Sequence, residues 1–322
     1  MKQISGLMFG LLALLIAGSP AAQTTYPEKP IHLVVGFPPG SSPDIVARLL
    51  GQKLTEALGK PVLIENVAGA SGIIATERVA KAAPDGYTLA FASSGFAVNP
   101  SLYANLPFDT VKDFAPISQV TVSSNILLVH NAVPAKSVQE LLALAKAQPG
   151  GLTFASGGSG SSSGLAGALF KSMGRIDIRE VPYKGVVAAI PDVLGGRVTM
   201  MFIPIPVGLP LAREGKLRAL AVTSLRRSAA APELPTVDES GVRGFEVTTW
   251  GGLLAPAGTP PAVIERLRSE IIKVLQMPEV RERMSSQGNE PVGSTSEQFS
   301  ALIKAELVKW AKVIKQSGIK PD

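Results

Sequence analysis

The chain has 322 residues, of which 46% are hydrophobic and 17% are charged, so it is long enough for two domains with apolar cores and too apolar to be disordered. It has no cysteine and only 2 histidines, which excludes disulfide scaffolds, thiol chemistry and cysteine-based metal sites, and leaves too few imidazoles for a histidine-built metal site. The net charge of +6 is spread along the chain without a block of like charges, so nucleic acid is not expected as a partner.

The first residues have the pattern of a secretory signal peptide, predicted at residues 1–21. Lys2 gives a positive start, residues 6–17 are apolar and uncharged, and Ser19-Pro20-Ala21 is a small-residue cleavage site. The apolar stretch is shorter than the roughly 20 residues of a membrane-spanning helix, which makes an uncleaved anchor the weaker alternative. We therefore expect a soluble, exported protein, most simply in a bacterial periplasm, where a supply of ATP or NAD is not assured.

The next part of the chain alternates short apolar strands with helices. Strands are expected at residues 30–36, 61–65 and 87–92, and helices at residues 42–58 and 73–82. Ser42 is expected to cap the first of these helices, with Pro43 at its first position. Because parallel strands need long crossover connections, this order predicts an α/β protein with a mostly parallel sheet flanked by helices.

A second series of the same units is expected from residue 126 onward. Its predicted strands are residues 126–130, 152–155, 179–183, 197–202, 217–223 and 248–254, and its predicted helices are residues 137–147, 165–173, 186–194, 261–276 and 296–316. Pro191 falls inside one of these helices, which predicts a kink just before Asp192 because proline lacks the N–H that a helix interior needs.

Two loops rich in glycine, serine or proline, residues 37–44 and 156–164, each join a predicted strand to a helix N-terminus. The first N–H groups of a helix have no partner within it and the helix dipole favours negative charge there, so each loop can bind an anion or simply cap its helix. If the two series of units face each other, both loops lie at the carboxyl ends of strands, where open α/β sheets bind ligands. These loops are the best candidate binding elements.

An enzymatic alternative comes from Gly160-Ser161-Ser162-Ser163-Gly164, which matches the G-x-S-x-G turn of α/β hydrolases with Ser162 as the nucleophile. Both histidines, His32 and His130, precede Ser162, against the chain order of that fold, and each lies in an apolar strand where a structural role is expected. No phosphate-binding P-loop and no dinucleotide fingerprint is present, so no cofactor is expected. An exported serine hydrolase remains the alternative hypothesis.

A series of short motifs runs in order along almost the whole predicted mature chain. They are Lys29-Pro30-Ile31, Phe37-Pro38-Pro39-Gly40 with Asp44, Glu65-Asn66 with Gly69-Ala70, Pro84-Asp85-Gly86-Tyr87, Val181-Pro182-Tyr183-Lys184-Gly185, Leu194-Gly195-Gly196, Leu220-Ala221-Val222-Thr223, Pro235-Thr236 with Glu239-Ser240-Gly241, and Trp250 with Ala255-Pro256-Ala257-Gly258. With these motifs the chain resembles the periplasmic receptors of tripartite tricarboxylate transporters, also called Bug-type solute-binding proteins.

The resemblance implies a two-domain, type II-like periplasmic-binding-protein fold with a ligand cleft between two α/β domains. One domain is expected at residues 26–124 together with 247–322, and the other at residues 125–246. The implied function is capture of a small organic acid, without catalysis, cofactor or metal, by a monomer that delivers it to the membrane subunits of a tripartite tricarboxylate transporter. Use of the same pocket to signal through a sensor kinase is the other reading of the resemblance.

By motif match, the resemblance also implies which residues contact the ligand. The expected pocket residues are Phe37, Pro39, Gly40, Ser41, Ser42, Asp44, Ser93, Ser94, Ser156, Gly158, Ser159, Gly160, Ser161, Tyr183 and Asp192. Ser41 stands where the family usually has glycine, so its Cβ and hydroxyl are expected to shrink the pocket. Gly164 stands where histidine is common, which makes the start of that helix different from its usual form.

Overall fold

The computed structural model describes residues 26–158, 160–183 and 185–317, so the predicted signal peptide and Ser159 lie outside the described residues. The strands are β1 (Ile31–Val35), β2 (Val62–Asn66), β3 (Thr88–Ser93), β4 (Phe114–Val129), β5 (Leu152–Ser156), β6 (Ile178–Pro182), β7 (Met200–Pro204), β8 (Arg218–Val222), β9 (Thr248–Pro256) and β10 (Glu290–Pro291). The helices are α1 (Ser42–Leu58), α2 (Ile73–Ala80), α3 (Gly95–Leu102), α4 (Val138–Ala147), α5 (Ser162–Gly174), α6 (Ile190–Leu194), α7 (Ile205–Arg213), α8 (Pro261–Gln276), α9 (Pro278–Ser286) and α10 (Ser296–Ser317), with short 3-10 turns η1 (Ala70–Gly72) and η2 (Val186–Ala189).

The sheet has the strand order β2-β1-β3-β9-β4-β7-β5-β6, with β8 and β10 also paired to β4. β1 is parallel to β2 and β3, and β5 is parallel to β6 and β7, which confirms the α/β class and the two sets of parallel strands. The two parallel sets are joined by β4 and β9, which run antiparallel to each other and to their other neighbours.

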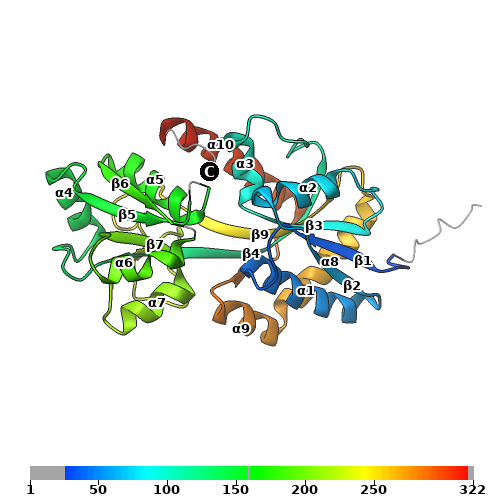
Figure 1. Cartoon of the computed structure of the whole chain (residues 1–322). Coiled ribbons are helices and arrows are strands. Elements are labelled where there is room, and N and C mark those ends of the chain that lie inside the picture. The colour runs from blue at the N-terminus through cyan, green and yellow to red at the C-terminus, as the bar shows by residue number, and fades with distance from the viewer. Residues whose placement is uncertain (1–25, 159, 184, 318–322) are drawn as a thin grey trace, which may run out of the picture.

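β4 connects the two halves of the molecule because one strand supplies side chains to separate cores. Ile117 and Val120, near its start, pack with the helices α1 and α8, whereas Leu127 and Val129, near its end, pack with α4 and α5. Figure 1 shows β4 and β9 crossing between a group of elements around β1 to β3 and a group around β5 to β7. The domain boundaries predicted at residues 124–125 and 246–247 fall on or beside these two strands and stay a prediction.

Several predicted elements have the predicted bounds or nearly so. The helix expected at residues 261–276 is α8 without change, while α5 begins at Ser162, three residues before the prediction. α5 starts early because the Ser161 side chain accepts a hydrogen bond from the N–H of Gly164 at 3.1 Å and so caps the helix. At α1 the N-cap is Ser41 and not Ser42, with φ −70° and ψ 158°.

Pro191 does not lie in a helix interior, where a kink was expected. The predicted single helix at residues 186–194 is divided into η2 and α6, and Pro191 lies in the first turn of α6. A proline there removes no helical hydrogen bond, because the first N–H groups of a helix have no partner within it. Asp192 therefore follows a normal helix start, and its carboxylate is bound by Tyr183 and Arg197.

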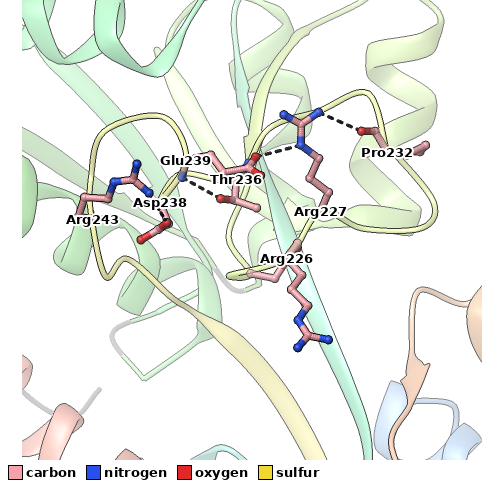
Figure 2. Close-up of polar contacts among 8 residues, drawn as sticks. Arg226, Arg227, Pro232, Thr236, Asp238, Glu239 and Arg243 are labelled. Atoms are coloured by element: carbon pink, nitrogen blue, oxygen red, sulfur yellow. Dashed lines mark hydrogen bonds and ion pairs between the residues drawn. The ribbon is translucent and has the colours of Figure 1, made fainter.

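The segment between β8 and β9 is held together by a reciprocal turn and an ion pair (Figure 2). The N–H of Thr236 donates to Oε2 of Glu239 at 2.9 Å, and the N–H of Glu239 donates to Oγ1 of Thr236 at 2.9 Å, which is the hydrogen-bond pattern of a capping box. Nε of Arg227 donates to the Glu239 carboxylate at 2.9 Å, so the two opposite charges are paired. The side chain of Arg226 points away from them.

Candidate functional site

Two adjoining cavities lie between the two halves of the molecule. The strand chamber, of about 310 Å³, is lined by Ser42, Pro43, Val46, Phe91, Ser93, Thr121, Ser123, Asn125, Ser162, Pro204, Pro206, Val207, Thr249, Trp250, Gly251, Gln287, Gly288 and Asn289. The loop chamber, of about 390 Å³, is lined by Phe37, Pro43, Ser71, Ser93, Ser94, Gly95, Asn99, Leu102, Tyr103, Gly157, Gly160, Ser161, Ser162 and Thr249. Pro43, Ser93, Ser162 and Thr249 line both chambers, so the two adjoin, and together they are called the cleft.

Four helices begin at this cleft, two from each half of the molecule. α1 and α3 contribute their first residues from one side, and α5 and α7 contribute theirs from the other. The N-terminal ends of α1, α3 and α7 have no side-chain cap, whereas α5 is capped by Ser161. Uncapped helix ends present free N–H groups and the positive end of the helix dipole to whatever occupies the chambers, which favours an anion.

The walls of the two chambers carry no Lys, Arg, His, Asp or Glu among the residues that the structure describes there. The polar groups are hydroxyls of serine, threonine and tyrosine, side-chain amides and backbone. Such a site orients an anion by hydrogen bonds and not by an opposite full charge. A hydroxyl or amide also accepts hydrogen bonds, so the same walls suit the hydroxyl groups of a ligand.

The first predicted loop contributes to the cleft with only some of its expected residues. Phe37 lines the loop chamber and Ser42 lines the strand chamber. Pro39, Gly40 and Ser41 line neither chamber. The φ of Gly40 is +80°, which favours glycine, and the Ser41 hydroxyl donates to the carbonyl of Pro38 at 2.7 Å, so these residues shape the turn.

Asp44 lies behind the first loop and lines neither chamber, with only 2% of its surface exposed. Its carboxylate accepts hydrogen bonds from the N–H of Gly40 at 2.8 Å, from Nδ2 of Asn66 at 2.8 Å and from Nε of Arg48 at 3.0 Å. Burial alone would raise the pKa of this carboxyl, but these three hydrogen bonds and the charge of Arg48 outweigh it and lower the pKa. The carboxylate thus fixes the loop to the ends of β2 and α1.

Part of the second loop, residues 156–164, lines the cleft. Gly160 and Ser161 line the loop chamber, as does Gly157, which was not among the expected residues. Ser156 and Gly158 are buried behind this surface, where Oγ of Ser156 accepts from the N–H of Gly158 at 3.3 Å. Ser159 lies outside the described residues.

Of the remaining expected residues, two line the cleft and two do not. Ser93 lines both chambers and Ser94 lines the loop chamber. Tyr183 and Asp192 line neither, and the Tyr183 hydroxyl donates to Oδ2 of Asp192 at 2.6 Å. The hydrogen bond from Tyr183, together with those from Arg197, lowers the pKa of the Asp192 carboxyl, which indicates a self-contained structural group.

The polar residues that the crossing strands supply were not expected from the sequence. Thr121, Ser123 and Asn125 alternate along β4 and line the strand chamber, and Thr249 of β9 lies beside them as the partner of Ser123. The signal was present as a period-two pattern of polar residues, which in a strand marks one face. It was overlooked because only the apolar end of this strand was predicted.

The structure gives the hydrolase hypothesis no support. Ser162 lines both chambers, but neither His32 nor His130 is among their lining residues. Nδ1 of His32 is bonded to the carboxylate of Glu65, and Nδ1 of His130 accepts from the N–H of Ala132 at 3.3 Å. A serine nucleophile needs an adjacent base, and no imidazole takes that position.

No cluster of three or more His, Asp or Glu side chains with the geometry of a metal site occurs in residues 26–158, 160–183 and 185–317. Within the same ranges, no helix is both long and apolar enough to cross a membrane.

An α/β molecule with two halves, bridged by antiparallel strands and with a polar cleft between the halves, has the fold of the periplasmic binding proteins. One such structure, "Structure of periplasmic binding protein BugD", is 35% identical, with a TM-score of 0.73 over 92% of this chain and 100% of that chain. A second, "R. palustris Rpa4515 with adipate", is 34% identical, with a TM-score of 0.77 over the same shares.

Comparison of sequences defines the family. The family model described as "Tripartite tricarboxylate transporter family receptor" matches residues 46–319. Protein BugT of Bordetella pertussis (strain Tohama I) is 38% identical over 94% of this chain and 93% of its own length. The chain belongs to the tripartite tricarboxylate transporter receptor family, whose members are periplasmic solute-binding proteins, so the resemblance stated from the motifs is confirmed.

Proposed function

We propose that this protein is a periplasmic receptor that captures a small organic carboxylate in the cleft and presents it to the membrane subunits of a tripartite tricarboxylate transporter. The observation that carries the proposal is the convergence of four helix N-termini on a cleft whose described walls have no charged side chain. Free N–H groups and hydroxyls suit carboxylate oxygens, which accept up to about four hydrogen bonds. The family assignment and the adipate of the related Rpa4515 structure support the same ligand class.

Closure of the two halves on the ligand is the mechanism that we propose for presenting it. α1 and the start of α3 pack with one half, and α5 and α7 pack with the other, so an anion that contacts both groups favours the closed state. The closed surface is then what the transporter distinguishes from the empty receptor. The crossing strands β4 and β9 are the proposed hinge, because both continue from one half into the other. α10 also reaches both halves, with Phe299 in a core of one and Trp310 in the core of the other.

The test is thermal unfolding of the exported chain, stripped of ligand by unfolding and refolding, with millimolar mono-, di- and tricarboxylates, amino acids and neutral amides. A ligand at 1,000 times its dissociation constant stabilises a protein by about 4 kcal/mol, so we expect an upward shift of several degrees for at least one carboxylate. Isothermal titration then gives its affinity.

A panel in which no carboxylate shifts the unfolding midpoint of folded, empty protein would overturn the carboxylate assignment. A shift produced only by neutral amides would do the same. Binding of a carboxylate without its uptake in cells that express the transporter subunits would leave capture intact and overturn delivery.

A further inference from the structure

We propose that Gly288 and Pro206 are positioning residues, which limit how far the two halves close through a contact that leaves no room for a side chain at residue 288. This inference rests on the proposed function, because the extent of closure matters only if the cleft captures a ligand. Both residues line the strand chamber. They act on a ligand through the position of the two halves.

Gly288 and Pro206 belong to different halves of the molecule. Gly288 follows α9, whose Met284 packs in the core that contains residues of α1 and α8. Pro206 is in the first turn of α7, whose Ile205 and Leu209 pack in a core of the other half. Figure 1 shows α9 and α7 on the same side of the crossing strands, one from each half. A contact between the two residues therefore crosses the cleft.

This contact lies beside β4, which is part of the proposed hinge. β10 pairs with residues 121–122 of β4 and β7 pairs with residues 125–129, both on the edge opposite to β9. Gly288 is two residues before β10 and Pro206 is two residues after β7, so both lie at the interval between these strands. Because the contact is next to the pivot, a small displacement there becomes a larger one at the distant loops.

Gly288 and Pro206 are so close that a side chain at residue 288 does not fit. A Cβ on Gly288 would be 2.2 Å from Cγ and 2.5 Å from Cδ of Pro206, closer than real Cβ atoms approach another atom. The proline ring is closed on its own backbone and cannot rotate away, so the two halves would have to separate. The next atom of Pro206, its backbone nitrogen, would be at 3.6 Å, which is an ordinary contact. Cγ and Cδ of Pro206 alone thus make the contact limiting.

Replacement of Gly288 also has a second effect, which a control must separate from the first. The φ of Gly288 is +69°, a left-handed conformation in which other residues are strained. Gly59, at the end of α1, has φ +68°, and nothing lies within 4 Å of the Cβ that alanine would add there. Gly59→Ala therefore has the same backbone strain without the contact, and is the matched control for Gly288→Ala.

The experiment compares the wild type, Gly288→Ala, Gly59→Ala, Pro206→Ala and the double variant that combines Gly288→Ala with Pro206→Ala. Isothermal titration measures binding of the carboxylate that raises the unfolding midpoint most in the thermal panel, with succinate, malate, adipate and citrate tried first. We expect Gly288→Ala to bind it about tenfold more weakly, because an anion that contacts both halves loses contacts when they stay apart, and Gly59→Ala to bind it as the wild type does. Since alanine has neither Cγ nor Cδ, the double variant should regain the affinity of Pro206→Ala.

Spin labels on Glu56→Cys of α1 and Ser172→Cys of α5 give a second readout, the distance between the two halves. With the same carboxylate at saturation, the labels should stay farther apart in Gly288→Ala than in the wild type, and the double variant should recover the shorter distance. A residue that only stabilised the turn after α9 would lower the unfolding midpoint of the empty protein and leave this distance unchanged.

Equal affinities of Gly288→Ala and Gly59→Ala would overturn this proposal alone and leave the proposed function standing. Weak binding by the double variant, with Pro206→Ala itself binding well, would also overturn it, because the added Cβ would then obstruct the ligand and not Pro206. Failure of every carboxylate in the panel to bind the wild type would overturn the proposed function, and the positioning role with it.

Discussion

At the scale of single residues, the cleft separates groups that face the ligand from groups that hold the walls. Ser162, at the first position of α5, faces both chambers, whereas Asp44 is buried behind the first loop with three hydrogen-bond donors. From the sequence, Ser162 was the candidate nucleophile and Asp44 was an expected pocket residue. In the structure, Ser162 brings the N–H groups at the start of α5 to the cleft, and the buried carboxylate of Asp44 holds the first loop in place.

Replacing Ser162 with proline tests whether a backbone N–H binds the ligand. Ser161, with φ −75° and ψ 156°, has the extended conformation that proline prefers in the residue before it, and the first helical position tolerates proline. Ser162→Pro therefore removes one N–H without breaking α5, and we expect carboxylate affinity to fall about tenfold, the loss of roughly 1.4 kcal/mol, in isothermal titration.

The matched control is Ser162→Ala, which keeps the N–H and removes only the hydroxyl. Its affinity should lie closer to that of the wild type. If Ser162→Pro bound carboxylate as tightly as Ser162→Ala, with both folded by circular dichroism, the N-terminus of α5 would not be a ligand donor.

Replacing Asp44 with asparagine tests how much its buried carboxylate stabilises the protein and how that contribution changes with pH. The folded-state pKa of Asp44 is lowered, so its contribution to stability is present above its ordinary value of 3.8 and is lost as the pH falls through the lower, folded-state value. We expect Asp44→Asn to lose about 1–3 kcal/mol at pH 7, since one buried hydrogen-bonded charge is removed, and to lose less at pH 3.

Urea unfolding at pH 7 and at pH 3 measures both effects. Asp177→Asn, at an exposed carboxylate that pairs with Lys171, is the control and should change stability by less than about 0.5 kcal/mol. If Asp44→Asn lost the same free energy of unfolding at both pH values, the stabilising role assigned to the ionised Asp44 carboxylate would be contradicted.

At the scale of elements, α5 lies close to the sheet because Gly167 has no side chain. A Cβ on Gly167 would be 2.0 Å from Cε2 of the buried Phe154 on β5. We expect Gly167→Ala to destabilise the protein by about 1–3 kcal/mol through overpacking, as measured by urea unfolding. Gly95→Ala, whose Cβ would have ordinary contacts at 3.7 Å, is the control, and an equally large loss there would refute the packing argument.

The elements also show what the sequence could predict. Regular amphipathic helices such as α8, and short apolar strands such as β1 and β5, follow from their local pattern and were found within a few residues. α7 was missed because Pro206 and Pro210 are normally read as breaks, although the first is in the initial turn and tertiary packing tolerates the second. The polar half of β4 was missed because its alternating side chains are polar residues that face a cleft, and not apolar residues that face a core.

The candidate site was predictable only where a local sequence pattern marks it. The two glycine- and serine-rich loops carry a local signal for a helix N-terminus, so Phe37, Ser42, Gly160 and Ser161 were expected and line the cleft. The Asn125 and Asn289 side chains come from segments that only the folded chain brings to α1 and α7, where Nδ2 of Asn289 donates to Oγ of Ser42 at 3.3 Å. No local pattern connects residues so far apart in sequence.

At the scale of the whole molecule, the crossing strands predict a hinge motion that spin labels can follow. Because the sequence has no cysteine, Glu56→Cys on α1 and Ser172→Cys on α5 place labels only at those two exposed positions. We expect a bound carboxylate to shorten and narrow the distance between them in pulsed electron resonance. Glu56→Cys with Gln276→Cys, on α1 and α8 of one half, should stay unchanged, and an unchanged first pair would contradict closure.

The lack of Lys, Arg, His, Asp and Glu side chains in the described walls of the cleft has a further consequence for how the receptor responds to pH. Backbone amides, serine and threonine hydroxyls and carboxamides do not titrate between about pH 4 and about pH 9. A plot of affinity against acidity would then trace the titration curve of the ligand itself and differ from acid to acid. Such a receptor detects the fraction of its ligand that is deprotonated, and acidification outside the cell would withdraw the ligand without altering the protein that binds it.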